Sequence, residues 1–169
     1  MKEEYLDIVD ENDIVIGKDT KSNKFEKELI SRSVAVLIKD SNGRFIIVKR
    51  APDKKSFPNG LDLAACGNVK SGESYEHAAL REIKEETGFS CSIRLLRKVY
   101  NEEMENSKKR RYFTSIFLAE SDAEITLNEE HVNYEKMPLN ELKQKINSNP
   151  ELFCPFFLKE IRAVEDLLE

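Results

Sequence analysis

The sequence predicts an α/β protein in which a mixed β-sheet carries helices on its faces and a β-hairpin lies near the N-terminal end. Three observations predict it. Runs of β-branched and aromatic residues flank strong turn signals in the first half of the chain. A stretch with helical spacing at 74–87 ends at a glycine. Further strand-like and helix-like runs follow, and this order of strands, helix, strands and helices indicates a layered α/β fold.

The first elements are predicted to be strands. The stretch LDIVDENDIVIG (6–17) holds two short apolar runs around Asp10–Asp13, which indicates a hairpin. Residues 20–30 are polar and are expected to form a short helix or a loop. In residues 33–50, two β-branched runs surround the turn signal Asp40–Gly43, which predicts a second pair of strands.

The later elements follow from the same signals. Residues 51–60 contain two prolines and a glycine and are predicted to be a loop, and the apolar run 61–66 is short enough to be one buried strand. The basic stretch SKKRR (107–111) is expected to be a solvated loop. Strands are predicted at 90–100 and 111–120, and helices at 74–87, 139–146 and 156–168.

Composition limits the classes of function. The chain has 169 residues, enough for one domain spanning 1–169, and 40% of them are hydrophobic and 35% charged. A net charge of −5 makes duplex DNA or RNA a poor partner. No apolar run reaches the roughly 20 residues that cross a bilayer, and the first residues lack the pattern of a signal peptide. Three scattered cysteines favour a reducing cytoplasm.

The helical stretch 74–87 carries an unusual concentration of acid. Glu82, Glu85 and Glu86 share one face of a helix, since residues three and four apart are neighbours. Three ionised carboxylates so close together repel one another, and a divalent cation bound by oxygen ligands offsets that repulsion. Arg81 and Lys84 supply partial relief without metal, so a solvent-facing helix with internal ion pairs stays an alternative.

The segment before this helix favours the metal site. Gly67 and Gly72 bracket a tight loop that follows a strand, and Glu73 is expected to open the helix, where its charge suits the helix dipole. A strand, a glycine loop and an acidic helix together make a rigid cup for a cation and for the phosphates bound to it. The opposite side of the helix is expected to pack on the sheet through Leu80, Ile83 and Thr87.

The stretch 67–89, GNVKSGESYEHAALREIKEETGF, resembles the Nudix box, G-x5-E-x7-R-E-U-x-E-E-x-G-U, in which U is a bulky aliphatic residue. Its fixed positions are matched by Gly67, Glu73, Arg81, Glu82, Ile83, Glu85, Glu86 and Gly88. Phe89 fills the last position and departs from the pattern because it is aromatic. The resemblance implies the Nudix fold, an α/β/α sandwich.

Nudix proteins typically hydrolyse a diphosphate linked to another moiety X with Mg²⁺ or Mn²⁺. The resemblance implies that the catalytic and metal-binding residues are Glu82, Glu85 and Glu86, with the carbonyl group of Gly67 as a further ligand. It also implies a structural pair of Glu73 and Arg81. The expected partner is a small-molecule diphosphate compound, and the chain is expected to be a monomer or a homodimer that binds no membrane.

The general base and the substrate contacts remain open. Two residues of the box, Glu82 and Glu86, are candidate bases. Five residues of predicted loops are further candidates, although each is alternatively a solvated surface residue: Glu102, Glu103, Glu105, Glu129 and Glu130. Candidate phosphate contacts are Lys49, Arg50, Lys54, Lys55, Arg110 and Arg111, of which Lys49 and Arg50 form the best pair. Candidate stacking residues are Tyr100, Tyr112 and Phe113, which core packing explains equally.

A looser resemblance covers more of the chain. The segments LDIVDENDIVIG, KRAPDKKSFPNGLDLAACGNV and FCPFF are similar to type 1 isopentenyl diphosphate isomerase, in which Cys66 would take part in proton transfer. Two histidines of its metal site are replaced by Asn68 and Ser31, which are poorer ligands. His77 and His131 are expected on the surface. Hydrolysis is therefore predicted over isomerisation, with a non-catalytic nucleotide-binding protein as a further alternative.

Overall fold

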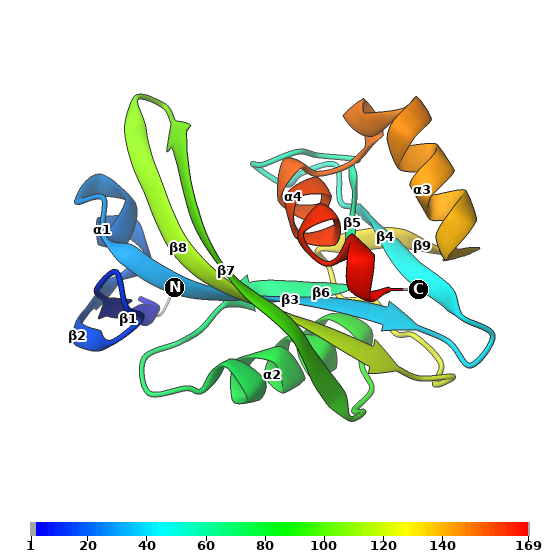
Figure 1. Cartoon of the computed structure of the whole chain (residues 1–169), viewed down its shortest axis with the longest axis horizontal. Helices are drawn as coiled ribbons and strands as arrows, with labels where there is room; N and C mark the ends of the chain where they lie inside the picture. Colours follow the sequence, from blue (N-terminus) through cyan, green and yellow to red (C-terminus); the bar gives the residue numbers. More distant parts are fainter. Residues whose placement is uncertain (1–2, 169) are drawn as a thin grey trace.

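A mixed β-sheet forms the centre of the molecule, and helices lie on both sides of it (Figure 1). The computed structural model describes residues 3–168. In chain order the strands are β1 (Tyr5–Val9), β2 (Val15–Thr20), β3 (Ile30–Lys39), β4 (Arg44–Arg50), β5 (Leu61–Leu63), β6 (Ala65–Asn68), β7 (Ile93–Glu105), β8 (Lys108–Glu120) and β9 (His131–Pro138). The helices are α1 (Lys21–Glu26), α2 (Tyr75–Thr87), α3 (Leu139–Ser148) and α4 (Pro155–Ala163), with short 3-10 turns at Pro150–Leu152 and Glu165–Leu167.

Strand β3 organises the sheet. One of its edges pairs in parallel with β8, and its other edge pairs antiparallel with β1 at its start, β6 in its middle and β4 at its end. Because both orientations occur, the sheet is mixed, as the sequence predicts. The remaining strands extend the sheet outward, with β2 beside β1, β7 beside β8, and β5 and β9 beside β4.

Two hydrophobic cores lie on opposite faces of β3. Val34 and Val36 pack on one face with Ile83 of α2, whereas Ala35 and Leu37 pack on the other face in the core that α3 and α4 complete. Side chains of a strand alternate between its two faces, so one apolar strand can serve both cores. The molecule is therefore an α/β/α sandwich, which confirms the predicted fold class.

The N-terminal hairpin is confirmed. Strands β1 and β2 pair antiparallel, and the carboxylate of Asp10 accepts hydrogen bonds from the N–H groups of Asn12 and Ile14 at 2.9 and 3.0 Å in the turn between them. Asp13, with a φ of 63°, binds Arg32 of β3 at 2.6 Å. This ion pair ties the hairpin to the central sheet.

The apolar run 61–66 forms parts of two strands, so the prediction of one strand is wrong. Strand β5 pairs with β4, whereas β6 pairs with β3, and Ala64 separates them. A continuous apolar run carries no sign that the chain changes its hydrogen-bonding partner. The change places Gly67 and Asn68, at the end of β6, beside the central strand β3.

Strands β7 and β8 form a longer hairpin than predicted, and Figure 1 shows its tip standing clear of the rest of the sheet. The turn lies at Asn106 and Ser107, which both have positive φ. Most of the stretch 107–111 is therefore strand rather than loop. Opposite charges face one another across the hairpin, as in the pair Glu102 and Arg111, and such cross-strand pairs stabilise extended structure.

Strand β9 was not predicted, because its sequence HVNYEKMP has little apolar alternation. It pairs antiparallel with β4 and buries two side chains, His131 and Met137. The prediction that His131 lies on the surface is therefore wrong.

The two C-terminal helices are confirmed, although α4 ends at Ala163 and the predicted continuation is a 3-10 turn. None of the helices in the part of the chain that the structure describes is long and apolar enough to cross a bilayer.

Candidate functional site

Helix α2 is fixed at both ends by its sequence. The hydroxyl group of Ser74 accepts a hydrogen bond from the N–H of His77 at 3.1 Å and so caps the first turn. Gly88 ends the helix in a left-handed conformation with a φ of 80°, which glycine adopts without strain. The helix begins at Tyr75, so Glu73 precedes it rather than opening it. His77 is exposed, as predicted.

The inner side of α2 packs on the sheet less broadly than predicted. Ile83 and Thr87 are fully buried, but Leu80 is exposed, so its predicted packing against the sheet is wrong. Two of the three clustered glutamates, Glu82 and Glu86, are buried with exposed fractions of 9% and 5%. The alternative of a helix whose acidic face is simply solvated therefore holds only for Glu85, the third member, which is exposed.

Burial and mutual repulsion act on these carboxyl groups. Burial raises the pKa of Glu82 above its usual value. Burial also raises the pKa of Glu86 well above its usual value, and the charges of Glu82 and Glu130 add to this effect. Ionising both groups without a compensating charge is costly in free energy. Arg81 already contacts Glu82, so a further positive charge beside Glu86 would favour the ionised form of both groups.

Arg81 ties the loop before α2 to the helix. Its guanidinium group donates to both carboxylate oxygens of Glu73 at 2.7 and 2.9 Å and to the carbonyl oxygen of Asn68 at 3.0 Å. It also donates to Glu82 at 2.6 Å and to Glu85 at 3.3 Å. The hydrogen bond from Arg81 lowers the pKa of Glu73, which stays ionised. The Glu73–Arg81 pair implied by the resemblance is thus present.

At Gly67 the main chain leaves room for the carboxylate of Glu82, and we call the space around Gly67, Glu82 and Glu86 the cradle. A Cβ atom at this position would lie 2.1 Å from Oε1 of Glu82, so any side chain would collide with that carboxylate. The neighbouring N–H of Cys66 points at Oε1 of Glu86 at 3.5 Å. Both buried carboxylates therefore lie directly against the main chain of β6.

The residues of this cradle suit a hard divalent cation. The available donors are carboxylate and carbonyl oxygens, which Mg²⁺ and Mn²⁺ prefer, and the burial of negative charge favours a doubly charged ion. Within residues 3–168, no three His, Cys, Asp or Glu side chains already stand in the arrangement of a metal site. Arg81 binds Glu85 as well as Glu82, so a site built from all three box carboxylates requires the exposed side chain of Glu85 to turn toward Glu82 and Glu86.

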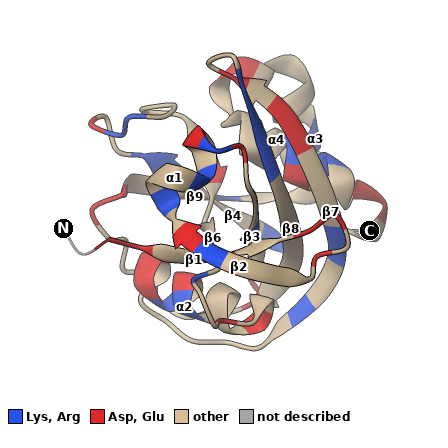
Figure 2. Ribbon diagram, turned by 90° about the vertical axis from the view of Figure 1, so that its left-hand side faces the viewer, with Lys and Arg blue, Asp and Glu red and all other residues tan. Residues whose placement is uncertain are grey.

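The acidic residues line a cavity of about 290 Å³. Its wall is formed by Glu4, Lys21, Cys66, Gly67, Asn68, Lys70, Arg81, Glu82, Glu85, Glu86 and Glu130. We call this the acidic cavity. Figure 2 shows acidic residues on α2 below basic residues on α1 and along β8.

A second cavity of about 290 Å³ is basic. Its wall is formed by Lys21, Lys24, Ser33, Arg50, Lys54, Ser56, Asp62, Cys66, Gly67, Asn68, Arg110, Tyr112, Glu130, Cys154 and Phe156. Five of these residues are cations and two are acids, so this basic cavity attracts anions. It shares Lys21, Cys66, Gly67, Asn68 and Glu130 with the acidic cavity, so the two cavities adjoin.

This geometry agrees with the comparison to known families. The sequence matches the family model of the NUDIX domain over residues 29–155. This chain belongs to the Nudix family. The stretch 67–89 is therefore its Nudix box, and α2 is the box helix. Nudix hydrolases generally use divalent metal ions, and the family match together with relatives named Nudix hydrolases supports a pyrophosphohydrolase enzyme.

Relatives of full length exist under two kinds of name. A Nudix hydrolase of Pseudomonas aeruginosa is 31% identical over 165 residues, which cover 96% of this chain and 94% of that protein. Isopentenyl-diphosphate Delta-isomerase 2 of Photorhabdus laumondii is 27% identical over 164 residues, which cover 96% of this chain and 93% of the isomerase. The crystal structure of DR0079 from Deinococcus radiodurans superposes with a TM-score of 0.77 at 27% identity and covers 95% of this chain and 99% of that one.

The predicted phosphate contacts divide into two groups. Arg50, Lys54 and Arg110 line the basic cavity. Lys49 and Lys55 are exposed and are not part of the wall of either cavity. Arg50 donates to Asp62 at 2.8 Å, and Lys54 donates to Glu130 at 2.5 Å, so both are held in place by ion pairs. The remaining candidate, Arg111, donates to the carbonyl group of Glu28, beside a smaller hollow.

The aromatic candidates differ in the same way. Tyr112 lines the basic cavity, with its ring centroid 6.3 Å from that of Phe156. Phe113 is buried in a small core under β1, and Tyr100 lies partly exposed against it with a centroid distance of 5.1 Å. Tyr112 is thus the aromatic candidate that the structure brings to the site.

Among the predicted loop carboxylates, Glu130 reaches the site. It lines both cavities. Burial acts to raise its pKa, but the hydrogen bond from Lys54 and the positive charges around it, that of Lys54 first, together lower it. The three glutamates predicted in a loop near residue 105 lie instead on β7, where they pair with cations: Glu102 with Lys109, Glu103 with Lys159, and Glu105 with Arg110. Glu129 is exposed.

Two residues at the site were not predicted. His131 places Nε2 3.8 Å from Oε2 of Glu86, and burial lowers its pKa to about 4, so the ring is neutral near pH 7. Lys24 of α1 donates to Asn68 and Ser31, the two positions that differ from the isomerase. Neither residue stands in a motif, and only the pairing of β9 and the packing of α1 bring them to the site.

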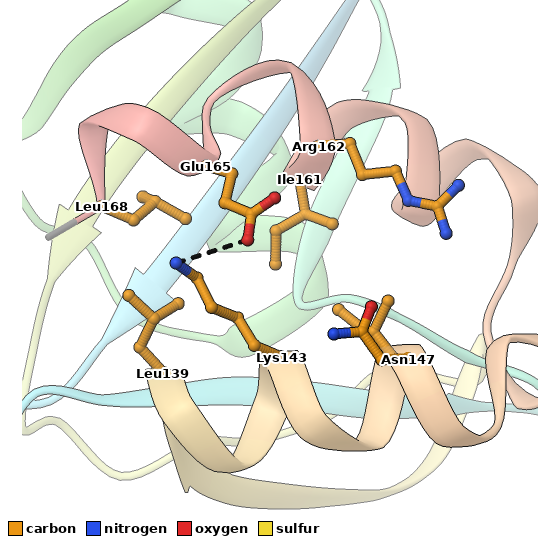
Figure 3. Close-up of a pocket in the computed structure, with 8 residues that line it drawn as sticks. Leu139, Lys143, Asn147, Ile161, Arg162, Glu165 and Leu168 are labelled. Atoms are coloured by element: carbon orange, nitrogen blue, oxygen red, sulfur yellow. Dashed lines mark ion pairs between the residues drawn. The ribbon is translucent and has the colours of Figure 1, made fainter.

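A separate small cavity lies between α3 and α4 (Figure 3). Its volume is about 30 Å³, which is room for little more than a water molecule. Lys143 and Glu165 form an ion pair of 3.3 Å across it. The cavity is too small for a diphosphate compound, and its wall shares no residue with the two larger cavities.

Proposed function

We propose that this chain hydrolyses a diphosphate bond in a nucleoside diphosphate linked to another moiety X, or in a related diphosphate compound, with Mg²⁺ or Mn²⁺ as the cofactor. One observation carries the proposal. A cavity lined by buried carboxylates adjoins a cavity lined by cations, and the two share the wall at Cys66–Asn68. The first suits a divalent cation and the second suits the phosphates of a substrate.

The proposed roles follow from the positions of the side chains. Glu82, Glu85, Glu86 and the carbonyl group of Gly67 would hold the cation, which neutralises phosphate oxygens and makes a bound water more acidic. Arg50 and Lys54 would orient the diphosphate from the basic side. Lys49 and Lys55 would contact only a substrate that extends out of the cavity, because both side chains are exposed.

We assign the general base to Glu130, ahead of Glu82 and Glu86. A base must be ionised and must reach the attacking water. Glu130 lines both cavities and has a lowered pKa, whereas burial raises the pKa of the other two. Glu130→Gln should lower kcat by at least about 100-fold with little change in KM. Glu129→Gln is the matched control, and equal activity of the two variants would remove Glu130 from this role.

The reaction itself is tested with a panel of substrates. Nucleoside triphosphates, nucleotide sugars, dinucleoside polyphosphates and prenyl diphosphates are incubated with and without Mg²⁺ or Mn²⁺, and phosphate and pyrophosphate release is measured. We expect metal-dependent release from at least one class, reduced by orders of magnitude in Glu86→Gln. Metal-independent turnover, or full activity of Glu86→Gln, would contradict the proposed roles.

Isomerisation of isopentenyl diphosphate is the second candidate, because full-length relatives carry that name and Cys66 lines the basic cavity. Two features weigh against it. Burial raises the pKa of Cys66 well above its usual value, which disfavours the thiolate. The ammonium group of Lys24 occupies the space between Ser31 and Asn68, and it repels a metal ion there. Conversion of isopentenyl diphosphate without phosphate release would favour the isomerase.

A role in nucleotide binding without catalysis is the third candidate. Ligand-induced shifts in melting temperature without release of phosphate would favour it.

We further propose one domain over residues 1–169, since the described residues share one central sheet. We also propose a monomer or homodimer in the cytoplasm, where the three free cysteines Cys66, Cys91 and Cys154 stay reduced.

A further inference from the structure

The ammonium group of Lys24 lies between two neutral oxygen atoms at the wall of the basic cavity. Nζ donates to Oδ1 of Asn68 at 2.7 Å and to Oγ of Ser31 at 3.2 Å, and within residues 3–168 it makes no other hydrogen bond. Lys24 is half-buried, and its ammonium group has three N–H donors. Lys24 therefore keeps one donor and a full positive charge for another partner.

Other cations surround this group. Lys21 and Arg110 line the same cavity. The pKa of Lys24 is lowered to about 8, mainly by its own burial and then by the charges of Arg110 and Lys21. The acids that offset Lys21 and Arg110 pair with those two residues and not with Lys24: Glu4 of the acidic cavity lies 3.5 Å from Lys21, and Glu105 and Glu103 lie 3.3 and 3.8 Å from Arg110. Three converging cations repel one another, so an anion between them is stabilising.

This group of cations is distinct from those assigned to the cleaved diphosphate. Arg50 and Lys54 are already paired with Asp62 and Glu130, whereas Lys24 has no carboxylate partner. Its partner Asn68 follows Gly67 on β6, so Lys24 is linked to the position next to the metal cradle. If a ligand fills the cradle and extends along the basic cavity, a part of it outside the cradle contacts Lys24.

We infer that Lys24, with Lys21 and Arg110, binds an additional phosphate group of the substrate, beyond the diphosphate that is cleaved. The inference rests on the proposed function because it takes the cradle as the place of the cleaved diphosphate. The substrate class is a diphosphate compound that carries extra phosphate, either as a third phosphate in line or on the moiety X. A prenyl chain or an unphosphorylated sugar leaves Lys24 without an anionic partner.

Binding of paired ligands tests the inference. Affinity is measured by titration calorimetry with Ca²⁺ as an oxygen-binding cation, for tripolyphosphate against pyrophosphate and for NADPH against NADH. The first pair differs by a phosphate in line and the second by a phosphate on the sugar. For the wild type we expect the ligand with the extra phosphate to bind at least about 10-fold more tightly in one pair, as a charge-assisted hydrogen bond predicts.

Three variants decide the outcome. Lys24→Met should reduce that ratio of affinities to about one, whereas Lys24→Arg should keep most of it. Lys18→Met, at an exposed lysine of β2, removes the same charge elsewhere and should leave the ratio unchanged. Circular dichroism checks that each variant is folded. If Lys24→Met does not fold, Arg110→Met is used in its place and should lower the same ratio.

The pair that responds identifies the position of the extra phosphate. An unchanged ratio in folded Lys24→Met for both pairs, or a wild type that does not discriminate within either pair, would overturn the inference. These outcomes are separate from failure of the proposed function, which is shown by the absence of metal-dependent hydrolysis of every diphosphate compound tested.

Discussion

At Gly67 the main chain of β6 lies directly against a carboxylate of the box helix. Gly67→Ala would place a methyl group 2.1 Å from Oε1 of Glu82 and force that side chain out of the cradle. We expect affinity for Mg²⁺ to fall by at least about 10-fold, because one ligand is displaced. The measurement is calorimetric titration with Mg²⁺.

Gly17→Ala is the matched control for this change. Gly17 lies on β2, its φ is not positive, and a Cβ atom there meets no other atom within 4 Å. This variant should bind Mg²⁺ as the wild type does. Equal affinity of the Gly67→Ala and Gly17→Ala variants would show that the contact between Gly67 and Glu82 does not shape the metal site.

Glu160 is a buried carboxyl group outside the site. Its Oε2 has no hydrogen-bond partner within the described residues, and burial raises its pKa from the usual 4.5 to about 7. Between pH 4.5 and about pH 7, Glu160 is therefore protonated in the folded state and ionised in the unfolded state. The free energy of unfolding falls as the pH rises from about 4.5 through 7, by on the order of 3 kcal/mol for a shift of this size.

Glu160→Gln should remove this contribution, since the amide stays neutral at every pH. Urea denaturation of the metal-free protein at pH 5 and pH 8 measures the difference. We expect the loss of stability between these pH values to be smaller in Glu160→Gln than in the wild type. Glu124→Gln, at an exposed position, should retain the full loss. An unchanged pH dependence in Glu160→Gln would refute the assigned burial effect.

At the level of single residues, positions on one helix face could be predicted from the sequence, whereas burial could not. The spacing of Glu82, Glu85 and Glu86 was enough to expect a shared helix face, because spacing on a helix is local information. The burial of Glu82 and Glu86 depends on β6, and the burial of His131 depends on β9. Both facts come from strand pairing between distant segments, which a short motif does not encode.

Arg81 of α2 binds the loop that precedes the helix, and these hydrogen bonds fix the position of the loop relative to the helix within the Nudix box. Arg81→Lys would lose the two parallel hydrogen bonds to Glu73 and the contact with the carbonyl group of Asn68. We expect a loss of stability of about 1–3 kcal/mol and weaker binding of Mg²⁺. Urea denaturation and calorimetry measure the two effects.

Arg94→Lys is a matched control, because Arg94 is exposed on β7, outside the box, and is not part of the wall of either large cavity. It should change neither quantity. If Arg81→Lys behaves like Arg94→Lys, the guanidinium group is not what holds the loop against the helix.

The elements differ in how well the sequence predicts them. Helix α2 was predicted closely, because an N-cap serine, a C-terminal glycine and helical spacing agree. The hairpin of β3 and β4 was predicted from its Asn42–Gly43 turn. Strands β5, β6 and β9 are short or polar, and the partners of β6 and β9 lie far away in the chain, so local signals could not separate β5 from β6 or detect β9.

At the scale of the whole molecule, the sandwich brings opposite charges into adjoining cavities. Carboxylates from α2 and cations from α1, the loop after β4 and β8 meet at the end of β6. The net charge of −5 does not reveal this separation, because it sums over the entire chain. The sequence could predict the acidic half from one motif, whereas the basic half is assembled from distant segments.

We propose that the buried carboxylates of the box helix are tolerated because they bind a divalent cation. Calorimetric titration of the metal-free protein with Mg²⁺ tests this in the wild type, in Glu86→Gln and in the exposed control Glu124→Gln. We expect the wild type and Glu124→Gln to bind Mg²⁺, and Glu86→Gln to lose affinity by at least about 100-fold. Absence of binding by the wild type, with or without pyrophosphate present, or undiminished binding by Glu86→Gln, would contradict it.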